Sequence, residues 1–126
     1  EGHFKKGMPD GHGTSYFDNG LIEYRGEWKQ RERDGHGTAY CRETGNKRYE
    51  GHFKKGKKHG HCTEYFDNGR SMYQGDWKEG WRDGHGVEYH RETGNKAYEG
   101  TFKGGQKHGV GTWYDEFGKA LDKVRL

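Results

Sequence analysis

The chain has 126 residues with 23 basic and 20 acidic side chains, and its net charge of +3 is too even to indicate nucleic-acid binding. Only 26% of the residues are hydrophobic and aliphatic side chains are scarce, which excludes a two-layer sandwich built on rows of Leu, Ile and Val. No run of eighteen apolar residues occurs, so the sequence predicts no transmembrane helix. Nine Tyr, six Phe and four Trp must supply the burial instead.

A five-residue pattern, Tyr-x-Gly-x-Trp or Phe, recurs along the chain. Complete copies begin at Tyr24, Tyr49, Tyr73 and Tyr98, after a truncated copy that ends at Phe4. The glycines of this pentad follow one another at steps of 24 or 25 residues, and a fixed period of this kind indicates a repeat protein. Because the sequence starts inside the first copy and without Met, it is interpreted as a fragment of a longer chain.

Each pentad is predicted to form the first strand of a hairpin. Side chains two residues apart share a face of a strand, so Tyr24, Gly26 and Trp28 lie on one side and charged residues lie on the other. The glycine leaves a slot across which a neighbouring ring can lie. A polar link, KQRERDG at 29–35 in this repeat, then leads to a second alternating strand, HGTAY at 36–40.

Two kinds of turn alternate between the repeats: FDNG at 17–20 and 66–69, and RETGNK at 42–47 and 91–96. Asn-Gly and Gly-Asn favour left-handed turn positions, and every connection is short. We therefore expect an all-β fold, an elongated and twisted single-layer antiparallel sheet of about ten strands, built as a meander of about five stacked hairpins with open ends. The predicted repeats are about 1–22, 23–47, 48–71, 72–96 and 97–118.

The pentad pattern stops after the array at 1–118. Phe117, Leu121 and Val124 have the i, i+4, i+7 spacing of one helical face. Residues 119–126 are therefore predicted to form a C-terminal cap or tail, with a short helix that covers the last strand.

The segments YEGHFKKGKKHGHCT at 49–63 and YEGTFKGGQKHGVGT at 98–112 resemble the MORN (membrane occupation and recognition nexus) repeat. The resemblance covers residues 1 to about 118, and the longer turns also make the chain similar to bacterial MORN-variant proteins described as antitoxin-like. It implies a twisted single sheet with an aromatic groove along one face. It supplies no catalytic residues, since the repeat has none of its own.

The aromatic side of the sheet is the first candidate site. A single-layer sheet has no second layer to cover its rings, so a partner peptide or helix is expected to lie in the groove that they form. The alternative is that the rings bury one another across strands. Trp81 is included because this turn position holds no aromatic residue in the other repeats, with packing on its own turn as the alternative. The predicted partner-binding residues are Tyr24, Trp28, Tyr49, Phe53, Tyr73, Trp77, Trp81, Tyr98 and Phe102.

A row of basic residues near the hairpin turns is the second candidate. Bases near a surface attract anionic lipid headgroups, but acidic residues dilute this row, and charges at an edge also keep a sheet from pairing with other chains. Membrane or phosphoinositide binding is therefore the alternative function. The residues concerned are Lys54, Lys55, Lys57, Lys58, Lys78, Arg82, Lys103 and Lys107.

No catalytic residues, metal or cofactor are predicted. Four histidines recur at one position of consecutive repeats, but two strands of advance place them about 10 Å apart, too far to share one metal. Repeated polar residues are usually structural, whereas an active site is a singular constellation. Cys41 and Cys62 are interpreted as reduced thiols of an intracellular protein. The four histidines are His12, His36, His61 and His85.

The sequence thus predicts a non-catalytic MORN-repeat scaffold that mediates protein–protein interaction through an aromatic groove. A cytoplasmic location is expected, with association to the cytoskeleton or a membrane. The alternatives are a peripheral membrane module that uses the basic turn edge and, for a bacterial source, an immunity or antitoxin-like binder. A homodimer through the sheet ends is a further expectation, and no nucleic-acid partner is expected.

Overall fold

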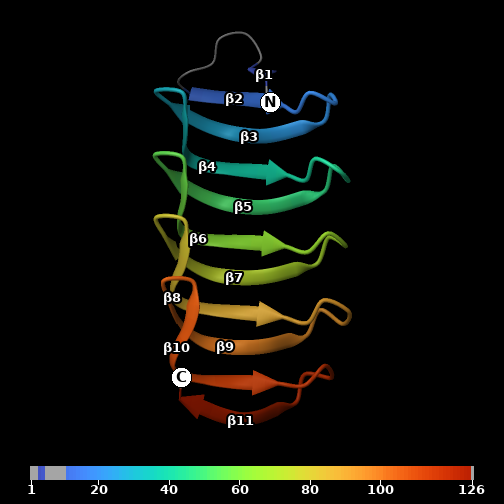
Figure 1. The fold of residues 1–126 in the computed structure, drawn as a ribbon, viewed down its shortest axis with the longest axis vertical. Coiled ribbons are helices and arrows are strands. Elements are labelled where there is room, and N and C mark those ends of the chain that lie inside the picture. The colour runs from blue at the N-terminus through green and yellow to red at the C-terminus, as the bar shows by residue number, and fades with distance from the viewer. Residues whose placement is uncertain (1–2, 5–10, 126) are drawn as a thin grey trace.

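The computed structural model describes residues 3–4 and 11–125 of the chain, which form one eleven-stranded sheet (Figure 1). No helix occurs among these described residues. The strands are β1 (His3–Phe4), β2 (Gly11–Tyr16), β3 (Ile22–Lys29), β4 (Glu32–Tyr40), β5 (Lys47–Lys54), β6 (Lys57–Tyr65), β7 (Ser71–Lys78), β8 (Trp81–Tyr89), β9 (Lys96–Lys103), β10 (Gln106–Tyr114) and β11 (Ala120–Arg125).

Every strand pairs antiparallel with its neighbours in sequence, from β1 at one end to β11 at the other. Figure 1 shows the consequence, a stack of hairpins along the long axis with the two chain ends at opposite ends of the stack. The sheet is a single open layer, so the predicted all-β meander is confirmed. Short connections leave sequential pairing as the natural topology.

The register repeats from hairpin to hairpin and places the pentad rings on one side of the sheet. Tyr24 lies opposite Ala39 and Gly26 opposite Gly37, and the same pairing recurs between Gly75 and Gly86. We call this side the ring face. The predicted glycine slot is present, because the Tyr24 side chain lies across Gly37, where an added β-carbon would be 1.9 Å from the Tyr24 hydroxyl.

The hairpin links are shorter than predicted. Strand β3 ends at Lys29 and β4 begins at Glu32, so most of the link expected at 29–35 belongs to a strand. The turn itself is residues 30–31, where Gln30 and Arg31 have φ of 52° and 69°. We call the side of the sheet formed by the turns at 30–31, 55–56, 79–80 and 104–105 the hairpin-turn edge.

The turns between repeats are linked to one another along the opposite edge. Asn19 donates from Nδ2 to the Arg42 carbonyl at 3.0 Å, and Asn68 donates to the Arg91 carbonyl at 3.0 Å. The Arg42 guanidinium adds an ion pair of 2.7 Å with Asp18 in the preceding turn. Each turn is therefore connected to the next by side chains as well as by the strands.

The predicted C-terminal helix is wrong. Residues Ala120–Arg125 form strand β11, which pairs with β10 through Gly111 opposite Val124. The reason is the preceding turn, in which the Asp115 N–H donates to the Lys119 carbonyl and Gly118 has φ of 87°. The turn between β2 and β3 has the same bond, from the Phe17 N–H to the Leu21 carbonyl. The turn signal continues after the pentad pattern has stopped, and the chain follows it into a strand that pairs with the edge of β10.

Candidate binding surface on the ring face

The pentad rings form a continuous edge-to-face row. Tyr49 lies 4.9 Å from Phe53 of its own pentad and 5.7 Å from Trp77 of the next, measured between ring centroids. Tyr24 makes the same pair of contacts at 5.0 and 5.3 Å, with Trp28 and Phe53. These are favourable geometries for aromatic pairs, and they make the rings the core of a protein that has few aliphatic residues.

This packing corrects the expectation of an open aromatic groove. None of the eight pentad rings is more than 7% exposed, so they bury one another and offer a partner little area. The small exposed fraction follows from the glycine slots, across which Tyr24, Tyr73 and Tyr98 lie, and from side chains that cover the rings. The eight rings are those of Tyr24, Trp28, Tyr49, Phe53, Tyr73, Trp77, Tyr98 and Phe102.

Cationic side chains lie over the rings. The Arg33 Cζ is 4.7 Å from the Tyr24 ring centroid, and the Arg82 Cζ is 4.4 Å from that of Tyr73. Lys58 Nζ lies 4.8 Å from the ring of Tyr49 and 4.8 Å from that of Trp77. Such contacts are favourable because the face of an aromatic ring is electron-rich. We call this set the cation row: Arg33, Lys58, Arg82 and Lys107.

The cation row changes the second candidate site as well. Lys58, Arg82 and Lys107 were expected in the basic row at the turn edge, but they lie over the rings. Each is the second residue of the strand that follows a two-residue turn. A register shift after the pentad glycine pairs this residue with the last residue of the pentad, as Arg33 with Trp28, and its side chain lies over neighbouring rings. The correction is thus a consequence of the short turns.

Carboxylates alternate with the cation row along the C-terminal half of the face. Arg82 donates to Glu64 at 2.8 Å and to Glu88 at 2.7 Å, and Lys107 lies 2.9 Å from Glu88. These side chains are between 17% and 26% exposed, so the ion pairs are partly buried. Partial burial and double hydrogen bonding make such pairs more specific in geometry than exposed ones.

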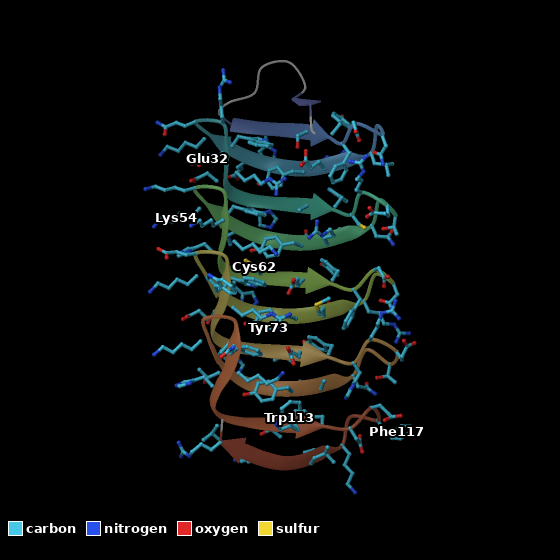
Figure 2. All side chains as sticks on the ribbon, viewed as in Figure 1. Glu32, Lys54, Cys62, Tyr73, Trp113 and Phe117 are labelled. Atoms are coloured by element: carbon cyan, nitrogen blue, oxygen red, sulfur yellow. The ribbon has the colours of Figure 1, made fainter. Side chains whose placement is uncertain are left out.

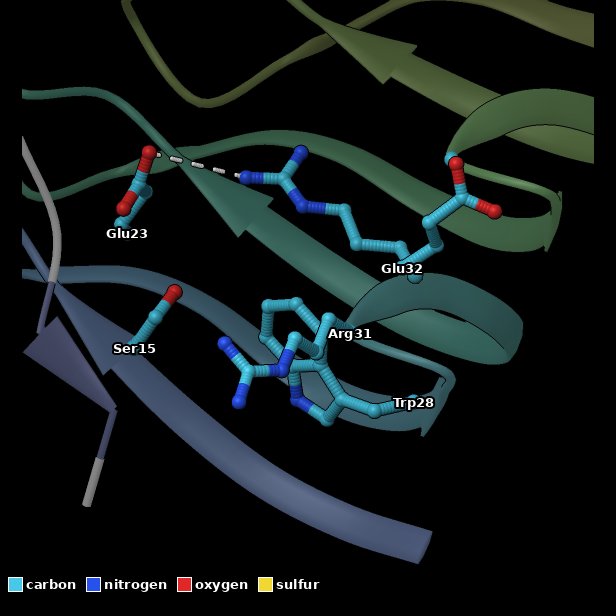
Figure 3. Close-up of a pocket in the computed structure, with 7 residues that line it drawn as sticks. Ser15, Glu23, Trp28, Arg31 and Glu32 are labelled. Carbon is cyan, nitrogen blue, oxygen red and sulfur yellow. Dashed lines mark ion pairs between the residues drawn. The ribbon is translucent and has the colours of Figure 1, made fainter. Parts of the chain in front are cut away.

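Two pockets open on the ring face above the rings. One, of about 380 Å³, lies beside Trp28, and Figure 3 shows Ser15, Glu23 and Arg31 around it together with the 3.7 Å ion pair between Glu23 and Arg33. The second has a volume of about 230 Å³ and lies over the next repeat. Its lining residues are Arg33, Ala39, Arg48, Tyr49, Phe53, Lys58, Glu64, Tyr65 and Met72.

The remaining lysines of the predicted basic row stay at the hairpin-turn edge. Lys54, Lys55 and Lys57 are exposed and line a pocket of about 290 Å³ together with His59 and Glu79. Figure 2 shows Lys54 and Glu32 projecting from this edge, with Phe117 at the opposite one. Lys78 and Lys103 are also exposed.

Trp81 is both exposed and packed. It is 61% exposed, yet its ring lies so close to the next turn that a β-carbon on Gly105 would be 2.7 Å from it. The ring therefore packs on the turn of the next hairpin and not on its own turn, and its role in binding a partner stays a prediction.

The four recurring histidines, at 12, 36, 61 and 85, lie on the other side of the sheet from the rings. His36 packs against His52 with ring centroids 5.6 Å apart, while His61 and His85 approach Asp76 at 3.7 Å and Glu99 at 3.4 Å. Within residues 3–4 and 11–125, no group of three or more His, Cys, Asp or Glu is arranged to hold a metal ion.

Cys62 fills a slot position rather than presenting a thiol. It pairs with Gly51, where the other hairpins place a second glycine, and it is 1% exposed. Burial raises the pKa of the Cys62 thiol, which keeps it protonated and a poor nucleophile. Cys41 is half-buried in a turn, and neither cysteine forms a disulfide.

Comparison with known families decides what this array is. The MORN repeat matches residues 1–22, 24–43, 49–69, 73–91 and 98–115, which together make up most of the chain. The chain belongs to the MORN repeat family. MORN repeats are generally associated with protein and membrane binding, and the repeat is typically a non-catalytic module. A search of curated proteins found no match.

The MORN array brings together some predicted residues and adds others that sequence reasoning missed. The rings gather in one row, but the ring face also carries charged residues that the prediction did not name: Arg33, Arg48, Glu23, Glu64 and Glu88. The sequence signal that could have identified the cation row is the base that recurs at 33, 58, 82 and 107.

No helix of the described segments has the length and apolar character needed to cross a membrane.

Proposed function

We propose that this MORN array is a protein-binding module whose partner segment lies along the ring face and contacts the charged side chains above the buried rings. The observation that carries the proposal is the pair of pockets over consecutive repeats, each lined by both a buried or half-buried ring and charged groups. Such a mixture of apolar floor and polar contacts is usual in recognition sites. The rings act here as the rigid floor of the surface.

The repeat spacing favours an elongated partner. Successive hairpins advance by about 10 Å, twice the distance between neighbouring strands. A peptide in extended or helical form that runs along the stack would therefore meet equivalent positions at regular intervals. The partner class proposed is a peptide segment of another protein, bound across at least two repeats.

A peptide selection on two matched variants tests this proposal. Peptides are selected from a displayed random library on the immobilised chain, then synthesised and measured by calorimetry. Arg48 is exposed and lines the second pocket. Arg48→Glu is expected to lower the affinity of the chain for the selected peptides at least about tenfold, because charge complementarity is lost. Arg25→Glu, at an exposed residue on the other side of the sheet, is the control and should leave affinity within about twofold.

Two results would contradict the proposal. One is a set of selected peptides that depends on Arg25 and is indifferent to Arg48. The other is a selection in which no synthetic peptide shows saturable binding.

The hairpin-turn edge supports a second candidate, binding to an anionic membrane. Lys54, Lys55 and Lys57 are exposed around one pocket, and a base near the surface contributes about 1 kcal/mol of attraction to anionic lipid. Sedimentation with phosphatidylserine vesicles should then be strong at low salt, fall as salt is added, and weaken in the double variant Lys55→Ala/Lys57→Ala. Absence of sedimentation at low salt would eliminate this candidate.

A further inference from the structure

The residue that pairs with the pentad tyrosine is a carboxylate in the two central hairpins and is uncharged in the two outer ones. In each hairpin, one residue of the second strand pairs with the pentad tyrosine: Glu64 pairs with Tyr49 and Glu88 with Tyr73. In the hairpin of β3 and β4 the residue that pairs with Tyr24 is Ala39, and in the hairpin of β9 and β10 the residue that pairs with Tyr98 is Trp113. At Ala39 a methyl group thus stands where the two following hairpins carry a carboxylate.

The carboxylate at this position joins successive members of the cation row. Glu88 contacts Arg82 of its own hairpin at 2.7 Å and Lys107 of the next at 2.9 Å. Glu64, one hairpin earlier, contacts Arg82 of the next hairpin at 2.8 Å. By the same arrangement, the group between Arg33 and Lys58 would come from residue 39, and Ala39 cannot supply it.

The space left at this point is the second pocket. Arg33, Lys58 and the exposed Arg48 line its 230 Å³ together with Ala39, and the rings of Tyr49 and Phe53 form its floor. Its one lining carboxylate, Glu64, is engaged by Arg82. The pocket is therefore lined by three bases and one carboxylate, and Arg33 has a further carboxylate, Glu23, at 3.7 Å.

The protonation behaviour of the two cations fits this imbalance. Burial lowers the pKa of Arg33, and the charge of Arg48 lowers it further against the opposing effect of Glu23. Burial also lowers the pKa of Lys58, with Glu64 opposing and Arg48 and Arg82 adding to the shift. A negative charge placed among these groups would therefore be stabilised by them.

We propose that this pocket binds a carboxylate of the partner segment, an Asp or Glu side chain that enters between Arg33 and Lys58 and takes the place of the group missing at Ala39. Arg48 lies at the pocket as a third donor, and the rings of Tyr49 and Phe53 contact the apolar part of the entering side chain. The inference rests on the proposed function and names the residue class that the partner contributes. It assigns one repeat of the array as the determinant of specificity for acidic segments.

An NMR titration with small probes tests the site apart from any partner. N-acetyl-glutamate amide is expected to shift the side-chain NH signals of Arg33 and Arg48 saturably, and the isosteric N-acetyl-glutamine amide should bind about tenfold more weakly, since hydrogen bonds between charged groups are the stronger ones. In Ala39→Glu the response to the glutamate probe should disappear, because the protein's own carboxylate occupies the site. Inorganic phosphate is the third probe and should bind no more tightly than the glutamate probe.

A stability measurement provides a readout without any ligand. Ala39→Glu is expected to fold, because Glu64 and Glu88 occupy the equivalent positions, and to melt about 3 °C above Ala39→Gln, which has nearly the same size and no charge. A higher melting temperature for the glutamine variant would overturn the inference. Equal binding of the glutamine and glutamate probes, tighter binding of phosphate, or an unchanged response in Ala39→Glu would do the same.

The two proposals fail in different ways. If selected peptides depend on Arg48 but tolerate replacement of all their acidic residues by Gln or Asn, the protein-binding function stands and the carboxylate site falls. If the glutamate probe binds saturably while no peptide does, the pocket recognises a carboxylate and the partner segment is not a peptide of the proposed kind.

Discussion

Replacing Gly75 with Val is expected to lower the free energy of unfolding by about 3 kcal/mol, although Val is a better strand former than Gly. A β-carbon at residue 75 would lie 2.5 Å from the Gly86 Cα, 2.6 Å from the His85 carbonyl oxygen and 2.6 Å from the Tyr73 hydroxyl. Two of these atoms belong to the backbone of the paired strand, which cannot withdraw without breaking ladder hydrogen bonds. The Tyr73 ring would also leave the slot and with it the ring row.

Thr101→Val is the matched control for this prediction. Thr101 is an exposed strand residue on the other side of the sheet, so the same new side chain should change stability by no more than about 0.5 kcal/mol. Urea unfolding followed by tryptophan fluorescence compares the two midpoints, with circular dichroism as a second probe because repeat arrays can unfold in parts. Equal midpoints for the two variants would show that the slot is not tightly filled.

The fold was predictable because the sequence repeats its own register. A pentad glycine every 24 or 25 residues, with Asn-Gly or Gly-Asn between repeats, leaves one pairing, in which Gly26 lies opposite Gly37 and Tyr24 lies across that glycine pair. Local turn chemistry and side-chain alternation agree on that pairing, which is the condition under which a pattern specifies a structure. The same turn chemistry, at Gly118, also continues the sheet into β11 where the spacing of apolar residues had favoured a helix.

The accessible surface was not predictable to the same degree, because it depends on the hairpin turns. Type I′ turns are recognised by Asn, Asp or Gly at their centre, but the turn of the first complete hairpin has Gln30 and Arg31 at positive φ, and in the next two turns Lys55 and Glu79 precede the single glycine. Without knowledge of this two-residue turn, the sequence predicts that 29–35 is a loop and that Arg33 lies at the hairpin-turn edge. With a two-residue turn it belongs to a strand, and a register shift places it over Tyr24.

The extent of ring burial follows from contacts between repeats. The pentad alone shows that rings share a face, but the interleaving of Tyr49 with Trp77 of the next pentad closes the row. Cations then cover what remains, as Lys58 does for both rings. A prediction from one repeat in isolation therefore overstates the aromatic area that a partner can reach, and it misses the charged residues that a partner meets first.

Raising the pH above about 10 is expected to destabilise the array steeply, because its core is made of tyrosines. Burial raises the pKa of Tyr24 from 10.0 to about 12, and burial likewise raises the pKa of Tyr49, Tyr73 and Tyr98. Below pH 10 these groups are protonated in both the folded and the unfolded chain, so they do not change the free energy of unfolding with pH. Between about 10 and 12 the unfolded chain loses their protons while the folded chain keeps them, so stability falls as pH rises.

For Tyr24 alone, a shift of that size corresponds to about 3 kcal/mol of stability that is present below pH 10 and lost by pH 12. The free energy of unfolding of most domains is about 5 to 15 kcal/mol, so four buried tyrosines acting together are enough to unfold the array. Tyrosinate absorbance and far-ultraviolet circular dichroism, recorded on the same samples across the titration, should change together. The alternative outcome, ionisation of every tyrosine near pH 10 with the sheet intact, would mean that the row is open to solvent.

Tyr24→Phe separates the proton from the ring in this titration. The variant keeps the edge-to-face contacts with Trp28 and Phe53 but removes the hydroxyl, which donates to the Glu27 carbonyl at 3.2 Å. We expect it to be about 1 kcal/mol less stable at neutral pH and to lose less stability than the parent between pH 10 and 12, because one of the raised pKa values is gone. The two effects have opposite signs, so the stability curves of variant and parent should approach and then cross as the pH rises. A constant difference across the whole range would place the alkaline transition outside the ring row.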